Sequence, residues 1–304
     1  MKSHPNRWLL ASAGVIILLF AGLVYAWSVL ASPIAEEFPQ WTQAQLSLTF
    51  TLVMTMFCVG CLVGGFLTAK LKPSLYIMIS AAMFLAGFYL TSLSHSLISL
   101  YLSFGGLCGF ASGFAYNAVM SSIGRWFPDC PGLISGILLM GFGIGAFIIG
   151  KVYQAYTPAY VGGWRISFVV LGIVIFVVLF LCSSFIRKPD ASFVAPAAKT
   201  KKDSVAVDLP PMKVLKNSSF WLYYLWAIVI SAAGLVLVSQ ASGIAREVGT
   251  QISAATIATV VGLISIFNGI GRVILGGMYD KIGRRFTMQI VNVLFLVASG
   301  LLIY

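Results

Sequence analysis

The sequence predicts an all-α polytopic membrane protein, and two observations carry this prediction. Of the 304 residues, 60% are hydrophobic and only 9% are charged, and the mean hydropathy is +0.98. Apolar runs of about 20 residues, the length that spans a bilayer as a helix, recur along the chain. This composition excludes an ordinary soluble domain.

We expect nine membrane-spanning helices. Their expected ranges are 8–32, 45–69, 74–93, 97–122, 132–157, 164–187, 219–243, 253–279 and 286–304. The first run follows basic residues, as a signal peptide would, but it exceeds the length of a signal-peptide core and further spans follow it. It is therefore interpreted as the first helix.

The longest hydrophilic segment divides the chain. We expect an N-terminal six-helix bundle at 1–188, a cytoplasmic linker at 189–217 and an incomplete C-terminal bundle at 218–304. The linker is rich in proline and contains Lys199-Thr-Lys-Lys202. These lysines either contact anionic membrane lipid or simply form a solvated charged loop.

Positive charge is distributed unevenly between the two sides of the predicted bundle. Fifteen of the 19 Lys and Arg residues fall on the side of the N-terminus and the linker, three fall on the other side, and Arg272 lies within a span. The positive-inside rule places the N-terminus in the cytoplasm. We expect a multi-pass protein of the plasma membrane, the inner membrane of a bacterium. The net charge of +11 does not indicate nucleic-acid binding, because no basic face interleaved with aromatic residues is present.

Neither a metal site nor a catalytic site is apparent. The five cysteines lie mostly within spans, and Cys58-Val-Gly-Cys61 is interpreted as a pair of small buried side chains rather than a redox or metal motif. His4 and His95 are isolated near opposite membrane faces, and no cofactor is expected. The spans contain no HExxH motif and no paired carboxylates, so we do not expect an enzyme.

Arg272 is the one charged residue well inside an expected span. Inserting a cation there costs about 2.5–3.5 kcal/mol, so such residues usually have a function. A guanidinium offers a planar, bidentate fork that suits a small carboxylate. Asn268, four residues earlier, is expected to orient the guanidinium, to touch cargo or to serve in packing. The alternative for Arg272 is a side chain that extends toward the membrane surface.

An internal repeat supports two related halves. Gly22-Leu-Val24 recurs as Gly234-Leu-Val236, and Gly64-Gly65 recurs as Gly276-Gly277, both at an offset of 212. Parallel repeats of six helices each are the architecture of the major facilitator fold. The sequence contains about nine of twelve helices, and we expect a chain truncated after the ninth.

The segment Gly277-Met-Tyr-Asp-Lys-Ile-Gly-Arg-Arg285 resembles the major facilitator loop motif. Within it, Gly283 permits a sharp turn, and Asp280 is expected to pair with a basic residue across a moving interface. Ala69 stands where the motif of the first half would have Asp. The resemblance implies a role in gating for the polar residues of the second-half motif, which are Asp280, Lys281, Gly283, Arg284 and Arg285.

Four stretches resemble the oxalate/formate antiporter family. They are Gly22-Leu-Val-Tyr-Ala-Trp-Ser28, Arg125-Trp-Phe-Pro-Asp129, Gly163-Trp-Arg165 and Phe267-Asn-Gly-Ile-Gly-Arg272. In that family an arginine at the position of Arg272 acts with a lysine of the eleventh helix to neutralise a small carboxylate. The resemblance further implies a gating role for Arg125 and Asp129, although this chain has Cys130-Pro131 where the family has two cations.

Four aromatic residues match family positions that wall the central cavity: Tyr25, Trp27, Tyr116 and Phe142. With Arg272 and Asn268 they form the expected substrate-binding set. By its depth, Tyr25 is expected to lie too far from Arg272 to touch the same cargo atom.

The resemblance and the residues together favour a secondary transporter of small organic carboxylates that works by alternating access, and we expect a monomer. No Asp or Glu lies inside the nine expected spans, which favours anion exchange over a membrane-embedded proton relay. Two alternatives stay open: a monocarboxylate–proton symporter, and a membrane sensor or truncated remnant that transports nothing.

Overall fold

The computed structural model describes residues 6–67, 70–190, 193, 211–248 and 254–303, with the backbone alone at 211, 235–248, 254–265 and 302–303. Ala69 and most of the expected linker therefore lie outside the described residues. In the described part every regular element is helical. Six helical segments are long and apolar enough to cross a membrane: Arg7–Glu37, Gln43–Leu67, Pro73–Ser92, Leu97–Trp126, Pro131–Tyr156 and Trp164–Ser183.

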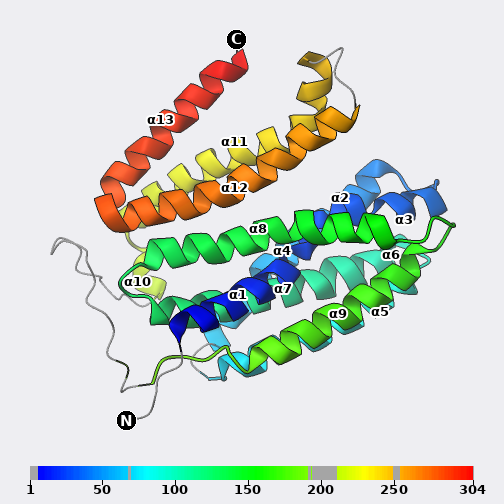
Figure 1. Cartoon of the computed structure of the whole chain (residues 1–304), viewed down its shortest axis with the longest axis horizontal. Helices are drawn as coiled ribbons and strands as arrows, with labels where there is room; N and C mark the ends of the chain where they lie inside the picture. The colour runs from blue at the N-terminus through cyan, green and yellow to red at the C-terminus, as the bar shows by residue number, and fades with distance from the viewer. Residues whose placement is uncertain (1–5, 68–69, 191–192, 194–210, 249–253, 304) are drawn as a thin grey trace.

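These six segments lie side by side as one bundle (Figure 1). Its elements are α1 (Arg7–Ala21), η1 (Gly22–Ala26), α2 (Trp27–Leu30), α3 (Ser32–Glu37), α4 (Gln43–Leu67), α5 (Pro73–Ser92), α6 (Leu97–Leu100), η2 (Tyr101–Cys108), α7 (Gly109–Ile123), η3 (Gly124–Trp126), α8 (Pro131–Tyr156) and α9 (Trp164–Ser183). The segments after the linker are α10 (Pro211–Leu215), α11 (Ser218–Val248), α12 (Ala254–Ile282) and α13 (Arg284–Ile303). The all-α polytopic prediction is confirmed.

The first span is longer than expected and is not one regular helix. It continues to Glu37, and at its middle the 3₁₀ turn η1 interrupts the α-helix. The Ser112 hydroxyl of α7 donates to the carbonyl of Ala21 at 2.8 Å, just where the pattern of backbone hydrogen bonds changes. A Cβ added to Gly22 would lie 2.0 Å from the carbonyl oxygen of Phe142, so η1 approaches the backbone of α8 closely.

Helix α8 occupies a central position because glycine lines two of its edges. On one edge a Cβ at Gly145 would lie 2.0 Å from the carbonyl oxygen of Leu19 on α1. On the other edge a Cβ at Gly132 would lie 2.3 Å from the carbonyl oxygen of Gly276 on α12. Small residues at such spacing allow helix backbones to cross in close contact. Helix α8 thus joins the first bundle to the segments after the linker.

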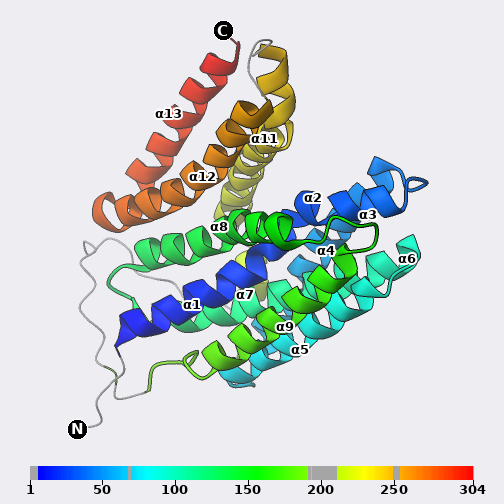
Figure 2. The ribbon, with the colours of Figure 1, turned by 45° about the vertical axis from the view of Figure 1, so that its right-hand side comes forward.

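Helices α11, α12 and α13 form a group that lies over α8, seen from two directions in Figures 1 and 2. Helix α12 packs on α8 and also contacts α11 and α13. The indole N–H of Trp226 on α11 donates to the side-chain oxygen of Asn292 on α13 at 2.8 Å. In the described part of the chain, the contact of this group with the first bundle is made mainly through α12.

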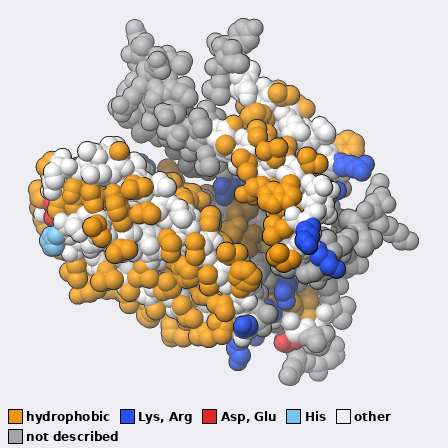
Figure 3. Space-filling view, turned by 180° about the vertical axis from the view of Figure 1, so that it is seen from behind, with side chains coloured by type: hydrophobic (Ala, Val, Ile, Leu, Met, Phe, Trp, Pro, Cys, Tyr) orange, Lys and Arg blue, Asp and Glu red, His pale blue; other side chains and the backbone are white. Residues whose placement is uncertain are grey.

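The two ends of the bundle differ in their charged contacts. At the end away from Arg7, Arg165 on α9 pairs with Glu37 on α3 at 2.7 Å, and the indole of Trp164 donates to the other Glu37 oxygen at 2.6 Å. At the opposite end, Arg7 pairs with Asp129. Figure 3 shows one face of the molecule, where hydrophobic side chains cover the first bundle and lysines and arginines gather at one end. We call the end that holds Arg7 and Asp280 the basic end.

Candidate functional site

Arg272 lies on the face of α12 that packs against α8. Its Nη1 atom donates to the carbonyl oxygen of Leu139 on α8 at 2.9 Å. The two backbones cross closely here, since a Cβ at Gly136 would lie 2.3 Å from the carbonyl oxygen of Arg272. The side chain is half-buried, and it forms no ion pair with any residue that the structure describes. A guanidinium has five N–H donors, so one bond to Leu139 leaves donors for an anion.

Three of the four aromatic residues expected in the cavity wall do come together. The ring of Phe142 lies 5.4 Å from that of Tyr25 and 5.5 Å from that of Tyr116, both in edge-to-face geometry. No hydrogen bond joins the side chain of Tyr25 or Tyr116 to that of Arg272. The turn η1 brings Tyr25 against α8, where its ring meets that of Phe142. That Tyr25 lies too far from Arg272 to touch the same cargo atom stays a prediction.

Two further aromatic residues complete this cluster, and the sequence analysis missed them. Phe57 on α4 lies 5.4 Å from Tyr116 and 5.7 Å from Phe142 between ring centres, and Phe50 lies 6.0 Å from Tyr25. Phe50 and Phe57 are seven residues apart, which puts them on one face of a helix. This seven-residue spacing in the sequence could have identified the pair as neighbours on one helix face. We call these five residues, Tyr25, Phe50, Phe57, Tyr116 and Phe142, the aromatic cluster.

Trp27 and Asn268 are placed differently from this cluster. The Trp27 indole is buried, donates to the carbonyl oxygen of Leu46 at 2.8 Å and packs 4.6 Å from the ring of Phe104. Its hydrogen-bond donor is thus used within the bundle. Asn268 is exposed and makes no hydrogen bond with Arg272, so the expected orienting contact is absent.

Asp280 connects the two halves at the basic end. Its two carboxylate oxygens accept hydrogen bonds from the backbone N–H groups of Gly132 at 2.8 Å and Leu133 at 2.7 Å. These N–H groups have no partner within their own helix because they belong to the first turn of α8. Pro131, the first residue of that turn, has no N–H group. The expected partner was a basic side chain. The structure instead pairs the carboxylate with the positive end of a helix.

The remaining residues of the loop motif surround this contact. Gly283 has φ of 85°, which favours glycine and makes the turn from α12 into α13. Lys281, Arg284 and Arg285 are exposed, with no ion pair to any described residue. Their charge gathers around the turn without fixed partners.

Asp129 and Arg125 lie at the same end but within the first bundle. Arg7 makes two hydrogen bonds to the carboxylate of Asp129, at 2.5 and 3.0 Å, and its guanidinium lies 4.8 Å from the ring centre of Phe127. Hydrogen bonding by Arg7 lowers the pKa of Asp129 below its usual range. This pair ties α1 to the turn before α8 rather than one half to the other. Arg125 is exposed.

The described residues contain no group of three or more His, Cys, Asp or Glu side chains that could hold a metal ion. Cys58 is exposed, and Cys61 donates to the carbonyl oxygen of Gly113 at 3.3 Å; both are free thiols. The arrangement therefore consists of one cation, an aromatic cluster beside it, and a hydrogen-bonded contact between halves. Chemically, it suits the binding of a small anion.

These features define a polytopic helical membrane protein with a half-buried arginine between two packed groups of helices. The family model of the Major Facilitator Superfamily matches residues 10–304. The chain belongs to this superfamily, whose members are membrane transporters, and it is an integral multi-pass membrane protein.

The chain is also similar to individual transporters of this superfamily. The chain is 28% identical over 287 residues to the oxalate:formate antiporter of Oxalobacter formigenes, a match that covers 94% of this chain and 66% of the antiporter. It is 27% identical over 300 residues to the uncharacterized transporter YhjX of Escherichia coli, covering 98% and 72% of the two chains. It is 33% identical over 119 residues to monocarboxylate transporter 12 of the mouse, covering 39% and 24%. The chain thus spans about two thirds of the length of the first two relatives.

Proposed function

We propose that this protein moves small organic carboxylate anions across the membrane by alternating access. One observation carries the proposal: Arg272 is held at the crossing of α8 and α12, beside the aromatic cluster, and no carboxylate among the described residues neutralises it. A carboxylate from solution would supply the missing charge. The similarity to the oxalate:formate antiporter supports this class of cargo.

The aromatic cluster shapes the space around the cargo. Tyr25 and Tyr116 bring two hydroxyl groups to this cluster, and the rings of Phe57 and Phe142 pack against them. In a site with little water, the attraction between the cation and a carboxylate is stronger than in bulk solvent. The cluster thus favours anions with one or two small carboxylate groups over bulky ones.

Arg272 and Asp280 are two tethers between the halves. Both bind α8, through Leu139 and through the first turn of the helix respectively. A cargo carboxylate competes with the Leu139 carbonyl for the guanidinium, and a charge-assisted hydrogen bond is the stronger of the two. Cargo binding would thereby weaken one tether and favour separation of α12 from α8 at the basic end.

The distribution of Lys and Arg assigns the basic end to the cytoplasm. In this assignment the structure is closed toward the cytoplasm by Asp280, with the Glu37 end facing outward. We further propose that the segments 1–188 and 218–304 are the two bodies that rock against each other, joined by the linker at 189–217. The location is the plasma membrane, and the transporting unit is one chain.

Uptake into proteoliposomes tests the function. Vesicles that contain the purified protein and are preloaded with formate should accumulate labelled oxalate or formate faster than protein-containing vesicles without internal formate. Arg272→Gln should abolish this uptake and Arg272→Lys should reduce it about tenfold or more, because a lysine cannot form the bidentate pair. Arg187→Gln, which removes an exposed arginine outside the expected binding and gating residues, is the matched control. Equal uptake by the Arg272→Gln variant and the wild type would refute the role of Arg272.

A second candidate, monocarboxylate–proton symport, is favoured by the similarity of part of the chain to monocarboxylate transporter 12. The two mechanisms differ in what drives uptake. Symport responds to an imposed pH gradient in vesicles without internal carboxylate, whereas exchange requires the internal anion. A chain that fails both assays would match the remaining alternative, a membrane sensor without transport.

A further inference from the structure

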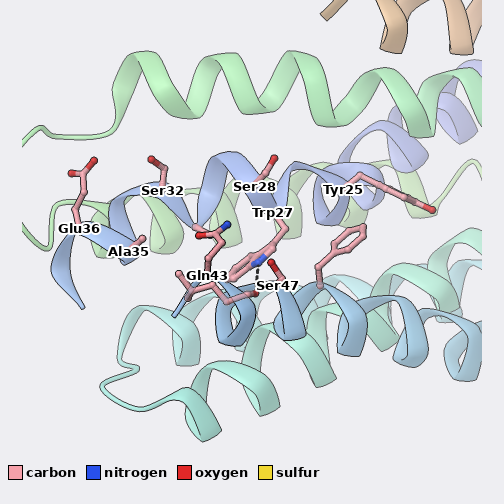
Figure 4. Close-up of a pocket in the computed structure, with 11 residues that line it drawn as sticks. Tyr25, Trp27, Ser28, Ser32, Ala35, Glu36, Gln43 and Ser47 are labelled. Carbon is pink, nitrogen blue, oxygen red and sulfur yellow. Dashed lines mark hydrogen bonds between the residues drawn. The ribbon is translucent and has the colours of Figure 1, made fainter. Parts of the chain in front are cut away.

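A pocket of about 740 Å³ opens at the end of the bundle away from Arg7. It lies between the outer part of the first span and the start of α4. Figure 4 shows its polar side chains arranged in sequence: Glu36, Ser32 and Ser28 from the first span, with Gln43 and Ser47 of α4 beneath them. Tyr25 of the aromatic cluster stands at the inner end. The pocket therefore extends from the Glu37 end of the bundle to Tyr25 and Phe50 of the aromatic cluster.

The serine and glutamine side chains of this pocket are not hydrogen-bonded to other residues in the part of the chain that the structure describes. The side chains of Ser28, Ser32 and Ser47 are exposed, and neither they nor Gln43 form a side-chain hydrogen bond with any described residue. Two other serines differ, because the hydroxyls of Ser12 and Ser135 donate to backbone carbonyls of their own helices. Helical serines commonly make such bonds to their own helix. Three free hydroxyls and an amide around one pocket form a set of available donors.

The pocket also carries one net negative charge. Glu36 is the charged residue of its lining, and it has no ion pair in the described part of the chain. The adjacent Glu37 is different, because Arg165 neutralises it at 2.7 Å. An anion that enters this pocket meets neutral donors and one uncompensated carboxylate.

We propose that this pocket is an outer binding site for a monocarboxylate, in which Glu36 discriminates against dianions. The proposal rests on the proposed function, since it assumes a carboxylate cargo. Hydroxyl and amide groups donate hydrogen bonds to carboxylate oxygens without neutralising their charge. A bound monocarboxylate therefore keeps its single negative charge, which the carboxylate of Glu36 repels. A dianion suffers that repulsion twice.

The size of this discrimination follows from Coulomb's law. Two unit charges about 10 Å apart in water repel each other enough to change an equilibrium about twofold, and a dianion about fourfold. Salt screens the effect, because the Debye length is only about 3 Å at 1 M ionic strength. Repulsion by Glu36 is therefore identified by comparing the size of the effect on the dianion with that on the monoanion, rather than by either effect alone.

Glu36→Gln tests this discrimination in transport. At low ionic strength we expect the KM for external formate to fall about twofold and that for external oxalate about fourfold, with both changes lost in 1 M salt. Lys151→Gln, which removes an exposed charge of α8 outside the pocket, is the control and should leave the ratio of the two KM values unchanged. An equal effect of Glu36→Gln on both anions would overturn the proposal.

A binding measurement separates this proposal from the proposed function. Ser47→Cys is introduced together with Cys58→Ser, and its reaction with a charged thiosulfonate is followed with and without formate. Formate should slow the reaction, and it should still do so when Arg272→Gln is added, because the outer site does not use Arg272. Leu48→Cys, an exposed neighbour outside the pocket lining, should not be protected.

The outcomes divide cleanly. Protection of Ser47→Cys without any transport would retain the outer site and reject the transport function. Loss of protection on adding Arg272→Gln, or no protection in either background, would reject the outer site whatever the transport result. Replacing Ser28 and Ser32 by alanine should remove protection while leaving protein yield and helical content unchanged.

Discussion

The contact between Asp280 and the first turn of α8 yields a prediction that can be worked in numbers. Asp280→Asn keeps the size of the side chain and one acceptor oxygen but removes the charge. Hydrogen bonds to charged groups contribute about 1.5–3 kcal/mol and neutral ones about 0.5–1.5 kcal/mol, and the helix end adds about 0.3–1 kcal/mol for an anion. Because the contact is only partly buried, we expect a net loss of about 1–2 kcal/mol.

A loss of this size changes the ratio of the closed to the open basic end by a factor of about 5–30. Spin labels at Arg125→Cys and Arg284→Cys, in a background with Cys58 and Cys130 replaced by serine, report the distance across this end. In the Asp280→Asn variant the distance distribution should gain a longer component at the expense of the shorter one. Pulsed electron–electron double resonance measures the populations of the shorter and the longer distance directly.

A matched variant controls for charge alone. Lys216→Gln removes an exposed charge outside the expected gating residues that has no ion pair with a described residue, so it should leave the distances as in the wild type. If Asp280→Asn leaves the populations unchanged, or if Lys216→Gln shifts them equally, the contact does not hold the basic end closed.

Three further predictions follow from packing and charge. Gly136→Ala should impair transport or folding because its Cβ would lie 2.3 Å from a backbone oxygen of α12, whereas Gly271→Ala, with nothing within 4 Å, should be tolerated; uptake and thermal unfolding test both. The lowered pKa of Asp129 means that the pair with Arg7 stabilises the fold above the usual Asp pKa and that this stability, about 1 kcal/mol, is lost as pH falls through the lowered value. Arg7→Gln should remove that part of the pH dependence of unfolding, and an unchanged profile would contradict it. Tyr116→Phe should raise KM for formate about three- to tenfold with normal protein yield, since one hydrogen bond contributes about 0.5–1.5 kcal/mol; an unchanged KM would remove its hydroxyl from the site.

The helices and their approximate ends could be predicted from the sequence because apolar length determines them. The run at 8–32, for example, lies within the observed segment Arg7–Glu37. The break at η1 could not be predicted, because it depends on the close approach of Gly22 to the backbone of α8. The helix propensity of a segment depends on its local sequence and does not indicate such contacts with another helix. Membership of the superfamily was predicted from short motifs and is confirmed by the match over residues 10–304.

For the candidate site, residue types were easier to predict than partners. Tyr25, Tyr116 and Phe142 were identified from the resemblance and do cluster. The partner of Asp280 was mistaken because the sequence displays basic side chains, whereas the free N–H groups of a helix end become visible only once the helix is placed. Whether these residues bind cargo stays a prediction.

The glycine edges of α8 have a consequence for how this protein can evolve. Most helices have one face on which substitutions are tolerated and one that is constrained by a neighbour. On α8, both Gly132 and Gly145 sit where any side chain would overlap a backbone atom of another helix, and the two neighbours are different helices. A mutation that improves the fit to one neighbour leaves the other unchanged, so sequence drift along α8 requires paired changes in α1 or α12. We expect new cargo preferences to arise sooner from changes in α4 or in the outer pocket than from changes in α8.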